Sequence, residues 1–273
     1  MPWGALVQDS VALLVYPGLL ASAMFGLAVE ATGTRLLGGR SSFPRGLWPA
    51  LRAGRLSPVE AAVALLAALS ASQLALPFNP LSPTERNVLI AAVALVSASW
   101  LVRGGGREKG GRGGAPLALV AEGCWLIALM APALVSQSLR PQVLGAVVLI
   151  SLVPLKLVAA ALYLLCLPVL LQLLPEMRGE AEDGAGVERP ARFLLWLPTC
   201  GLFASVYVPA PGDAVLAVLA YAVATVGAAA VAYQVTSVLV RWRLVSARTA
   251  YMRLGLVLAL VTLLLAVVAE ATT

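Results

Sequence analysis

Residues 142–174 read QVLGAVVLISLVPLKLVAAALYLLCLPVLLQLL, and residues 175–188 continue as PEMRGEAEDGAGVE. The first segment is an apolar run longer than the roughly 17–25 residues that cross a bilayer as a helix, and its one charged residue is Lys156. The second segment holds five of the 13 acidic residues of the chain. Charges next to hydrocarbon are costly unless they have a role. The pair of segments therefore predicts a membrane helix that ends in a functional, charged loop.

The composition of the whole chain gives the same class. Of the 273 residues, 60% are hydrophobic and only 12% are charged, and the mean hydropathy is +0.92. These values exclude a soluble globular protein and predict an all-α integral membrane protein, because helices satisfy their own backbone hydrogen bonds in lipid. A single transmembrane domain over residues 1–273 is expected, with Pro154 and Pro168 as kink points in its fifth span. The bundle is predicted to have about eight spans: 11–31, 60–78, 87–102, 115–136, 142–174, 193–211, 213–240 and 249–269.

Arginine and lysine gather in every second connection between these spans. Basic loops stay on the cytoplasmic side, so the pattern places both termini outside and makes 32–59, 103–114 and 175–192 cytoplasmic. Trp48 and Arg52 suit an interfacial helix within 32–59. Residues 103–114 are rich in glycine and arginine, and they predict a flexible linker because they lack the Lys-Ser/Thr ending of a phosphate-binding loop. The net charge of +6 thus reflects topology, and no nucleic-acid partner is predicted.

Cofactor chemistry within this chain is not expected. The chain has no histidine, and Cys124, Cys166 and Cys200 each stand alone within a predicted span. Isolated cysteines of this kind are typical core residues. We therefore predict no metal ligand set, no redox centre and no nucleophile pair in this chain.

Four charged residues within or beside the spans have individual interpretations. Glu122 is either an intramembrane proton carrier, or a residue that extends to the basic cytoplasmic boundary or pairs with an arginine. Lys156 pairs with Glu122, pairs with another subunit, or marks the end of a span. Glu30 is expected at the membrane interface, and Asp213 is expected to cap the seventh helix.

The acidic loop has a regular internal spacing. Glu176, Glu180, Gly184 and Glu188 follow one another at intervals of four, which would place them on one face of a helix. Carboxylates held close together cannot all ionise without cost, so the loop is a candidate proton reservoir. The alternative is a solvated loop whose charge the neighbouring arginines balance.

This spacing, directly after Leu174-Pro175, resembles a loop of a known family. The family comprises the membrane subunit that joins the two arms of respiratory complex I (its H-type, or subunit 1, component) and its relatives in group 4 membrane-bound nickel-iron hydrogenases and formate hydrogenlyases. Residues 16–20 (YPGLL), 114–122 (GAPLALVAE) and 241–244 (RWRL) are similar to further family segments, in the expected order. The family's Pro-Pro-Phe-Asp element is absent, and Arg189-Pro190 replaces the Tyr-Ser that follows the last glutamate. These departures favour a hydrogenase-type version.

The resemblance implies a non-catalytic subunit that anchors the complex and couples electron transfer in a peripheral arm to proton or sodium translocation. It implies hydrogenase-like large and small subunits, iron-sulfur subunits and antiporter-like membrane subunits as partners, which would carry the nickel-iron centre and the iron-sulfur clusters. The location would be a prokaryotic-type cell membrane, as a multi-pass protein. The coupling residues would be Glu176, Glu180, Asp183, Glu188, Glu122 and Lys156, and the residues that dock subunits or membrane lipid would be Arg35, Arg40, Arg192, Arg241 and Arg243.

Other functions stay open from the sequence. A quinone-reducing, complex I-like subunit is one alternative, and a stand-alone transporter or permease is another. The transporter interpretation is not supported by an inverted repeat or by polar residues within the spans. A lipid-modifying membrane enzyme is disfavoured because no histidine and no clustered polar motif lies in the spans.

Overall fold

The computed structural model describes residues 3–36, 57–104, 114–146, 152–174, 191–241 and 245–272. All regular secondary structure in these ranges is helical. The acidic residues Glu176, Glu180, Asp183 and Glu188, together with Arg40 and Arg243, lie outside the described residues. The helices are α1 (Trp3–Leu14), α2 (Leu19–Leu36), α4 (Pro58–Ser72), α5 (Val88–Gly104), α6 (Gly114–Val135), α7 (Pro141–Ala146), α8 (Val153–Leu170), the short 3₁₀ helix η3 (Arg192–Leu195), α10 (Trp196–Tyr207), α11 (Ala214–Arg241) and α12 (Val245–Thr272).

Five helical segments in the described part are long and apolar enough to cross a membrane. They are Leu6–Gly33, Ala115–Val135, Val153–Leu170, Ala214–Leu239 and Tyr251–Ala271. Two shorter apolar helices, Pro58–Ser72 and Val88–Arg103, correspond to the second and third predicted spans. The membrane-protein prediction is supported, whereas the count of eight spans and the outer location of both termini stay predictions.

Four predicted spans differ from the helices in the structure. The first, 11–31, is divided by a turn over residues 15–18 into α1 and α2, and its helix begins earlier, at Trp3. The second, 60–78, forms α4, which ends at Ser72. Within the fifth, 142–174, the structure describes two helices, α7 and α8, and Pro154 lies in the first turn of α8 rather than at a kink within one helix. The sixth, 193–211, forms η3 and then α10, which ends at Tyr207. Hydropathy alone does not mark these breaks, because the residues around them are apolar.

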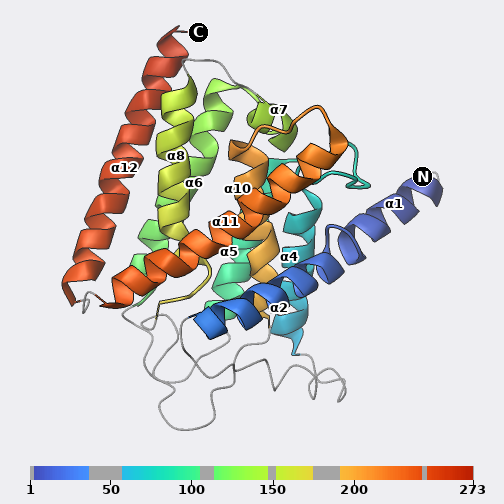
Figure 1. Ribbon diagram of the computed structural model, residues 1–273, viewed down its shortest axis with the longest axis horizontal. Helices are drawn as coiled ribbons and strands as arrows, with labels where there is room; N and C mark the ends of the chain where they lie inside the picture. The colour runs from blue at the N-terminus through green and yellow to red at the C-terminus, as the bar shows by residue number, and fades with distance from the viewer. Residues whose placement is uncertain are drawn as a thin grey trace.

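The helices form a bundle around α10 (Figure 1). α6, α8 and α12 pack against one another on one side, and α4 and α5 pack together on the other. α11 crosses the bundle obliquely and contacts α10 and α8, while α2 contacts α10, α4 and η3. The interior is filled by large side chains, including Trp125, Tyr163 and Trp196, each fully buried.

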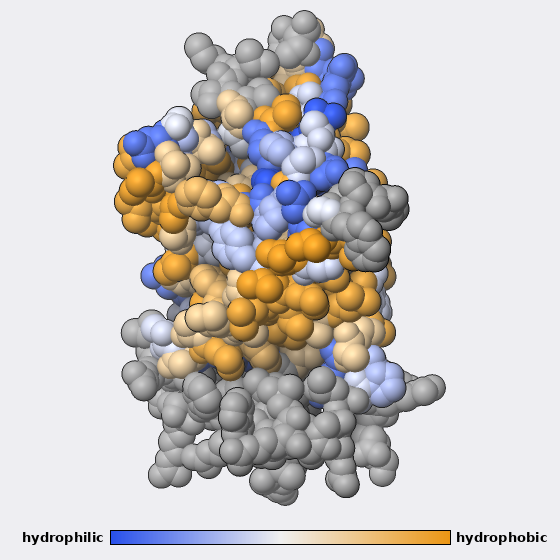
Figure 2. Space-filling view, turned by 90° about the vertical axis from the view of Figure 1, so that its right-hand side faces the viewer, coloured by the Kyte–Doolittle hydropathy of each residue, from blue (hydrophilic) through white to orange (hydrophobic). Residues whose placement is uncertain are grey.

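The helix ends that flank the basic loops lie together at one end of the bundle (Figure 1). This end, which we call the basic end, includes Leu36 of α2, Gly104 of α5, Gly114 of α6, Arg241 of α11 and Val245 of α12. The connections α4–α5, α6–α7 and α10–α11 lie at the opposite end. Figure 2 shows an apolar belt across one face of the molecule, with hydrophilic side chains gathered above it toward the opposite end. The alternation of basic and non-basic connections therefore corresponds to two distinct ends of the bundle.

Local capping fixes two of the helix starts. Ser57 and Glu60 form a reciprocal capping box at α4, with Pro58 in the first turn, as expected for a helix N-terminus. The carboxylate of Asp213 accepts hydrogen bonds from the backbone N–H groups of Val215 (2.7 Å) and Leu216 (3.1 Å) at the start of α11. The predicted N-cap role of Asp213 is confirmed.

Candidate functional site

Two ion pairs, one buried and one partly buried, lie toward the basic end of the bundle, and the first joins α5 to α6. Arg103 Nη2 lies 2.7 Å from Glu122 Oε1, and only 13% and 6% of the two side chains are exposed. Because Glu122 lies nine residues into α6 while Arg103 is in the last turn of α5, the arginine reaches back along the bundle to meet the carboxylate. A buried charge persists only where an opposite charge and hydrogen bonds compensate its lost hydration.

Two more side chains of α5 complete the surroundings of this pair. The indole N–H of Trp100 donates to Glu122 Oε2 (2.8 Å), and Arg103 Nη2 donates to the hydroxyl oxygen of Ser99 (2.7 Å). The Arg103 guanidinium carbon lies 5.5 Å from the centroid of the Trp100 ring, which is within cation–π range. Oε1 of Glu122 therefore faces Arg103, and Oε2 faces Trp100.

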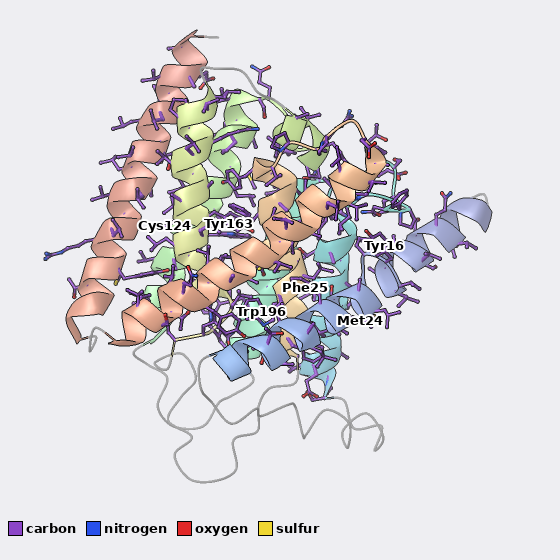
Figure 3. The ribbon with its side chains drawn as sticks, viewed as in Figure 1. Tyr16, Met24, Phe25, Cys124, Tyr163 and Trp196 are labelled. Carbon is purple, nitrogen blue, oxygen red and sulfur yellow. The ribbon has the colours of Figure 1, made fainter. Side chains whose placement is uncertain are left out.

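The second ion pair joins α2 to η3. Glu30 Oε1 accepts hydrogen bonds from Arg192 Nη2 (2.7 Å), Arg192 Nε (3.2 Å) and the indole N–H of Trp196 (3.1 Å). Each side chain of the pair is 20% exposed. Trp196 is itself stacked on Tyr233 of α11, with ring centroids 5.1 Å apart and an interplanar angle of 21°, and Figure 3 shows it where α2 and α11 cross α10.

Two glycines of α2 allow this close approach. A Cβ added to Gly26 would lie 1.9 Å from the carbonyl oxygen of Phe193, the residue after Arg192. A Cβ added to Gly33 would lie 2.2 Å from Tyr233 Cζ. Since both distances are far shorter than any real Cβ contact, only glycine lets η3 and Tyr233 pack so tightly on α2, and Glu30 lies between these two glycines in the sequence.

Gln172 connects the two ion pairs. It is 4% exposed, directly follows the C-terminal turn of α8, and has a left-handed backbone conformation with φ of 51°. Its carbonyl oxygen accepts a hydrogen bond from Arg192 Nη1 (3.4 Å), and its side-chain amide donates to the carbonyl oxygen of Ser99 (3.3 Å). Ser99 in turn accepts from Arg103, so a continuous polar chain runs from Glu30 to Glu122 through the packed helices.

The structure brings together only some of the residues that the sequence singled out. Glu122 forms an ion pair with an arginine, which was one of the interpretations of this residue. Its side chain is buried and does not extend to the boundary. Lys156 lies at the opposite end, in the first turn of α8, where its ammonium donates to the carbonyl oxygen of Leu144 in α7. Within the described residues it does not pair with Glu122. Arg192 belongs to the second ion pair, while Arg35 and Arg241 lie in the last turns of α2 and α11.

Sequence reasoning missed most of the partners in this chain of contacts. Glu30 was expected at the interface, and Trp100, Gln172 and Trp196 were not singled out. A signal for one pair was present, because Glu30 and Arg192 have opposite charges and lie next to predicted loops on the same side of the membrane. No sequence rule places Gln172 between two ion pairs, because that position depends on how α8 ends against α5.

The opposite end of the bundle contains a different polar arrangement. Arg86, 6% exposed, donates to the carbonyl oxygens of Leu81 (2.6 Å from Nη2), Asn79 (3.2 Å from Nη2) and Leu74 (3.4 Å from Nη1). Burial lowers the pKa of Arg86, but a guanidinium stays charged. A cavity of about 70 Å³ also lies at this end, lined in part by Gln142, Ser205 and Tyr221.

The chemistry of the two ion pairs is electrostatic. Glu30 accepts hydrogen bonds from Arg192 and Trp196, and Glu122 forms an ion pair with Arg103 and accepts a hydrogen bond from Trp100, so each carboxylate faces one arginine and one indole N–H group. Among the described residues, no cluster of three or more His, Cys, Asp or Glu side chains has metal-binding geometry. The arrangement can hold charge within the bundle and can respond to a change of charge nearby.

Comparisons with known proteins inform the fold. No family model and no curated protein matches the sequence. Among solved structures, the chain is similar to a chain in the structure of the membrane-bound sulfane sulfur reductase (MBS), an archaeal respiratory membrane complex, with a TM-score of 0.61 and 11% sequence identity. The similarity covers 96% of this chain and 98% of that chain. The chain therefore shares, over nearly its whole length, the fold of a subunit of an archaeal respiratory membrane complex.

Proposed function

We propose that this chain is a non-catalytic, membrane-anchoring and coupling subunit of a multisubunit redox-driven ion pump, most similar to a membrane-bound hydrogenase-type complex. One observation carries the proposal: a buried ion pair, Arg103–Glu122, and a partly buried one, Glu30–Arg192, are linked through the hydrogen bonds of Gln172 near the basic end of a bundle with a respiratory-complex fold. A bundle that served only as an anchor would need no such buried charges, because burying them costs free energy.

The proposed role follows from the electrostatics of this region. Charges interact more strongly inside a protein than in water, since the effective dielectric constant is lower. A redox reaction in a subunit docked at the basic end would change the local charge, and Glu30 and Glu122 are carboxylates within the bundle that could respond to it. A shift in either pair alters the affinity of its carboxylate for a proton or cation, which is the elementary step of coupling.

The proposed partners divide the remaining chemistry among them. Hydrogenase-like and iron-sulfur subunits would hold the nickel-iron centre and the clusters, and would dock at the basic end near Arg35, Arg192 and Arg241. Antiporter-like membrane subunits would bind at the side of the bundle and translocate the ion. Glu176, Glu180, Asp183 and Glu188 are proposed to contribute to the coupling loop between docking surface and bundle.

The first test is mass spectrometry of the intact assembly, purified in mild detergent through a tag on this chain. Co-purification of hydrogenase-like, iron-sulfur and antiporter-like subunits is the expected result. A lone monomer or homodimer would contradict the proposal and favour a stand-alone transporter. Quinone-dependent electron transfer by the purified assembly would instead identify the complex I-like alternative.

The second test addresses coupling itself. The substitution Glu122→Gln removes a charge at nearly constant shape, so we expect assembled complexes that still transfer electrons in the peripheral arm but lose ion pumping in proteoliposomes. Glu85→Gln is the matched control, because Glu85 is an exposed glutamate in the α4–α5 connection at the opposite end. Equal pumping by wild type and Glu122→Gln would exclude Glu122 from coupling.

A further inference from the structure

We propose that Gln172 is a positioning residue that links the two ion pairs, so that the charge state of the Glu30–Arg192 pair changes the geometry of the Arg103–Glu122 pair. The link is a property of this chain's own side chains. It therefore holds or fails independently of the redox-linked function proposed above.

The first part of the argument is that Gln172 touches both pairs through different groups. Its backbone carbonyl oxygen accepts from Arg192 Nη1 (3.4 Å), while its side-chain amide donates to the backbone of Ser99 (3.3 Å). The backbone group holds the arginine that faces Glu30, and the side chain holds the segment of α5 that carries Arg103. A displacement of Arg192 therefore shifts the backbone of Gln172, and a displacement of Gln172 shifts the segment of α5 around Ser99.

The second part is that Gln172 has little freedom to absorb such a displacement locally. The residue is 4% exposed, and its φ of 51° is one that non-glycine residues adopt only where the surroundings hold them. Its neighbours Leu171 and Leu173 are 0% and 3% exposed and belong to the main core. Packed interiors transmit small shifts because they contain few voids.

The third part is that each ion pair carries its own reporter. The indole N–H of Trp196 donates to Glu30 (3.1 Å), and the indole N–H of Trp100 donates to Glu122 (2.8 Å). The 15N–1H signal of each indole therefore senses its own carboxylate. The six tryptophans of the chain give a spectrum simple enough to assign by single Trp→Phe substitutions.

The experiment records these indole signals from the protein in the assembly in which it purifies. Arg192→Gln is expected to shift the signal of Trp196, by direct loss of the ion pair, and also that of Trp100, although Arg192 does not touch Glu122. In a Gln172→Leu background, the same substitution is expected to shift Trp196 alone. The Trp125 signal serves as an internal check against general loss of structure.

Two further variants keep the test decisive. Glu30→Gln removes charge from the same pair and replaces Arg192→Gln if that variant does not fold. Arg253→Gln is the matched control, because Arg253 is an exposed arginine of α12, and it should shift neither signal. The proposal is overturned if Trp100 fails to respond to the loss of the Glu30–Arg192 pair, or if it responds equally with Leu at position 172.

Discussion

At the scale of single residues, the most consequential feature is that Glu122 and Arg103 are buried together. Their side chains are 6% and 13% exposed, so neither charge is well hydrated. Removal of one member of such a pair leaves the other charge uncompensated, at a cost of about 3–5 kcal/mol. The pair therefore adds little net stability, but the loss of either charge alone is costly.

Glu122→Gln is therefore expected to lower the free energy of unfolding by about 3 kcal/mol, because Arg103 keeps its charge and loses its counter-ion. An SDS titration of the protein in mixed micelles measures this change. The double variant Arg103→Met, Glu122→Leu should recover most of the loss, because an apolar pair of similar volume removes the unpaired charge. If the single variant is as stable as wild type, the stability of the bundle does not depend on the charge that Glu122 contributes to the ion pair with Arg103.

Arg86 gives a second prediction, at the opposite end of the bundle. Its guanidinium holds three backbone carbonyl oxygens of the α4–α5 connection, and hydrogen bonds from charged groups contribute about 1.5–3 kcal/mol each. Arg86→Met should destabilise the protein by about 2–3 kcal/mol. Arg86→Lys should be intermediate, because one ammonium group cannot reach all three oxygens. Arg140→Met, at an exposed position, is the control and should change stability by less than about 0.5 kcal/mol. A Lys variant no better than Met would show that fork geometry, rather than charge, matters here.

At the scale of elements, the contact between α2 and η3 decides whether Glu30 can reach Arg192. Gly26→Ala places a methyl group against the backbone of Phe193, so one of the two elements must move. We expect a loss of stability of about 1–3 kcal/mol, together with a weakened Glu30–Arg192 pair that the Trp196 indole signal reports.

Gly227→Ala is the matched control for this effect. Gly227 also lies within a long helix, α11, but nothing lies within 4 Å of an added Cβ there. Since alanine is a better helix former than glycine by about 1 kcal/mol, this variant should be neutral or slightly more stable. If both alanine variants behave alike in thermal unfolding, close packing of α2 on η3 is not what the Gly26 position requires.

The helices themselves were predictable to different degrees. The spans 87–102, 115–136, 213–240 and 249–269 agree with α5, α6, α11 and α12 to within a few residues, because polar loops bound these apolar runs. The starts of α2 and α8 were not predicted, since the sequence is apolar on both sides of them and only Pro17 and Pro154 hint at a boundary. Proline restricts the residue before it, but hydropathy does not show whether a bend or a break results.

At the scale of the whole molecule, the sequence predicted which ends of the helices gather, but not what lies between them. The alternation of basic and non-basic connections depends only on which residues lie in the connections, so it could be predicted directly from the sequence. The polar chain from Glu30 to Glu122 joins residues far apart in sequence, and it depends on tertiary packing that no periodicity encodes. The role of Glu176, Glu180, Asp183 and Glu188 in the 175–192 loop stays a prediction, as does the number of spans.

The orientation of the bundle gives the last prediction. The native cysteines Cys124, Cys166 and Cys200 are all buried, so a membrane-impermeant maleimide should label only a cysteine introduced at an exposed site. Ala210→Cys lies in the α10–α11 connection at the opposite end, and Thr249→Cys lies in α12 near the basic end; both positions are exposed. Because basic connections remain in the cytoplasm, intact cells should show labelling of Ala210→Cys alone. Thr249→Cys should react only after the cells are permeabilised. The reverse pattern would place the basic end outside, where no cytoplasmic redox subunit could dock, and would exclude the proposed assembly even if the fold were unchanged.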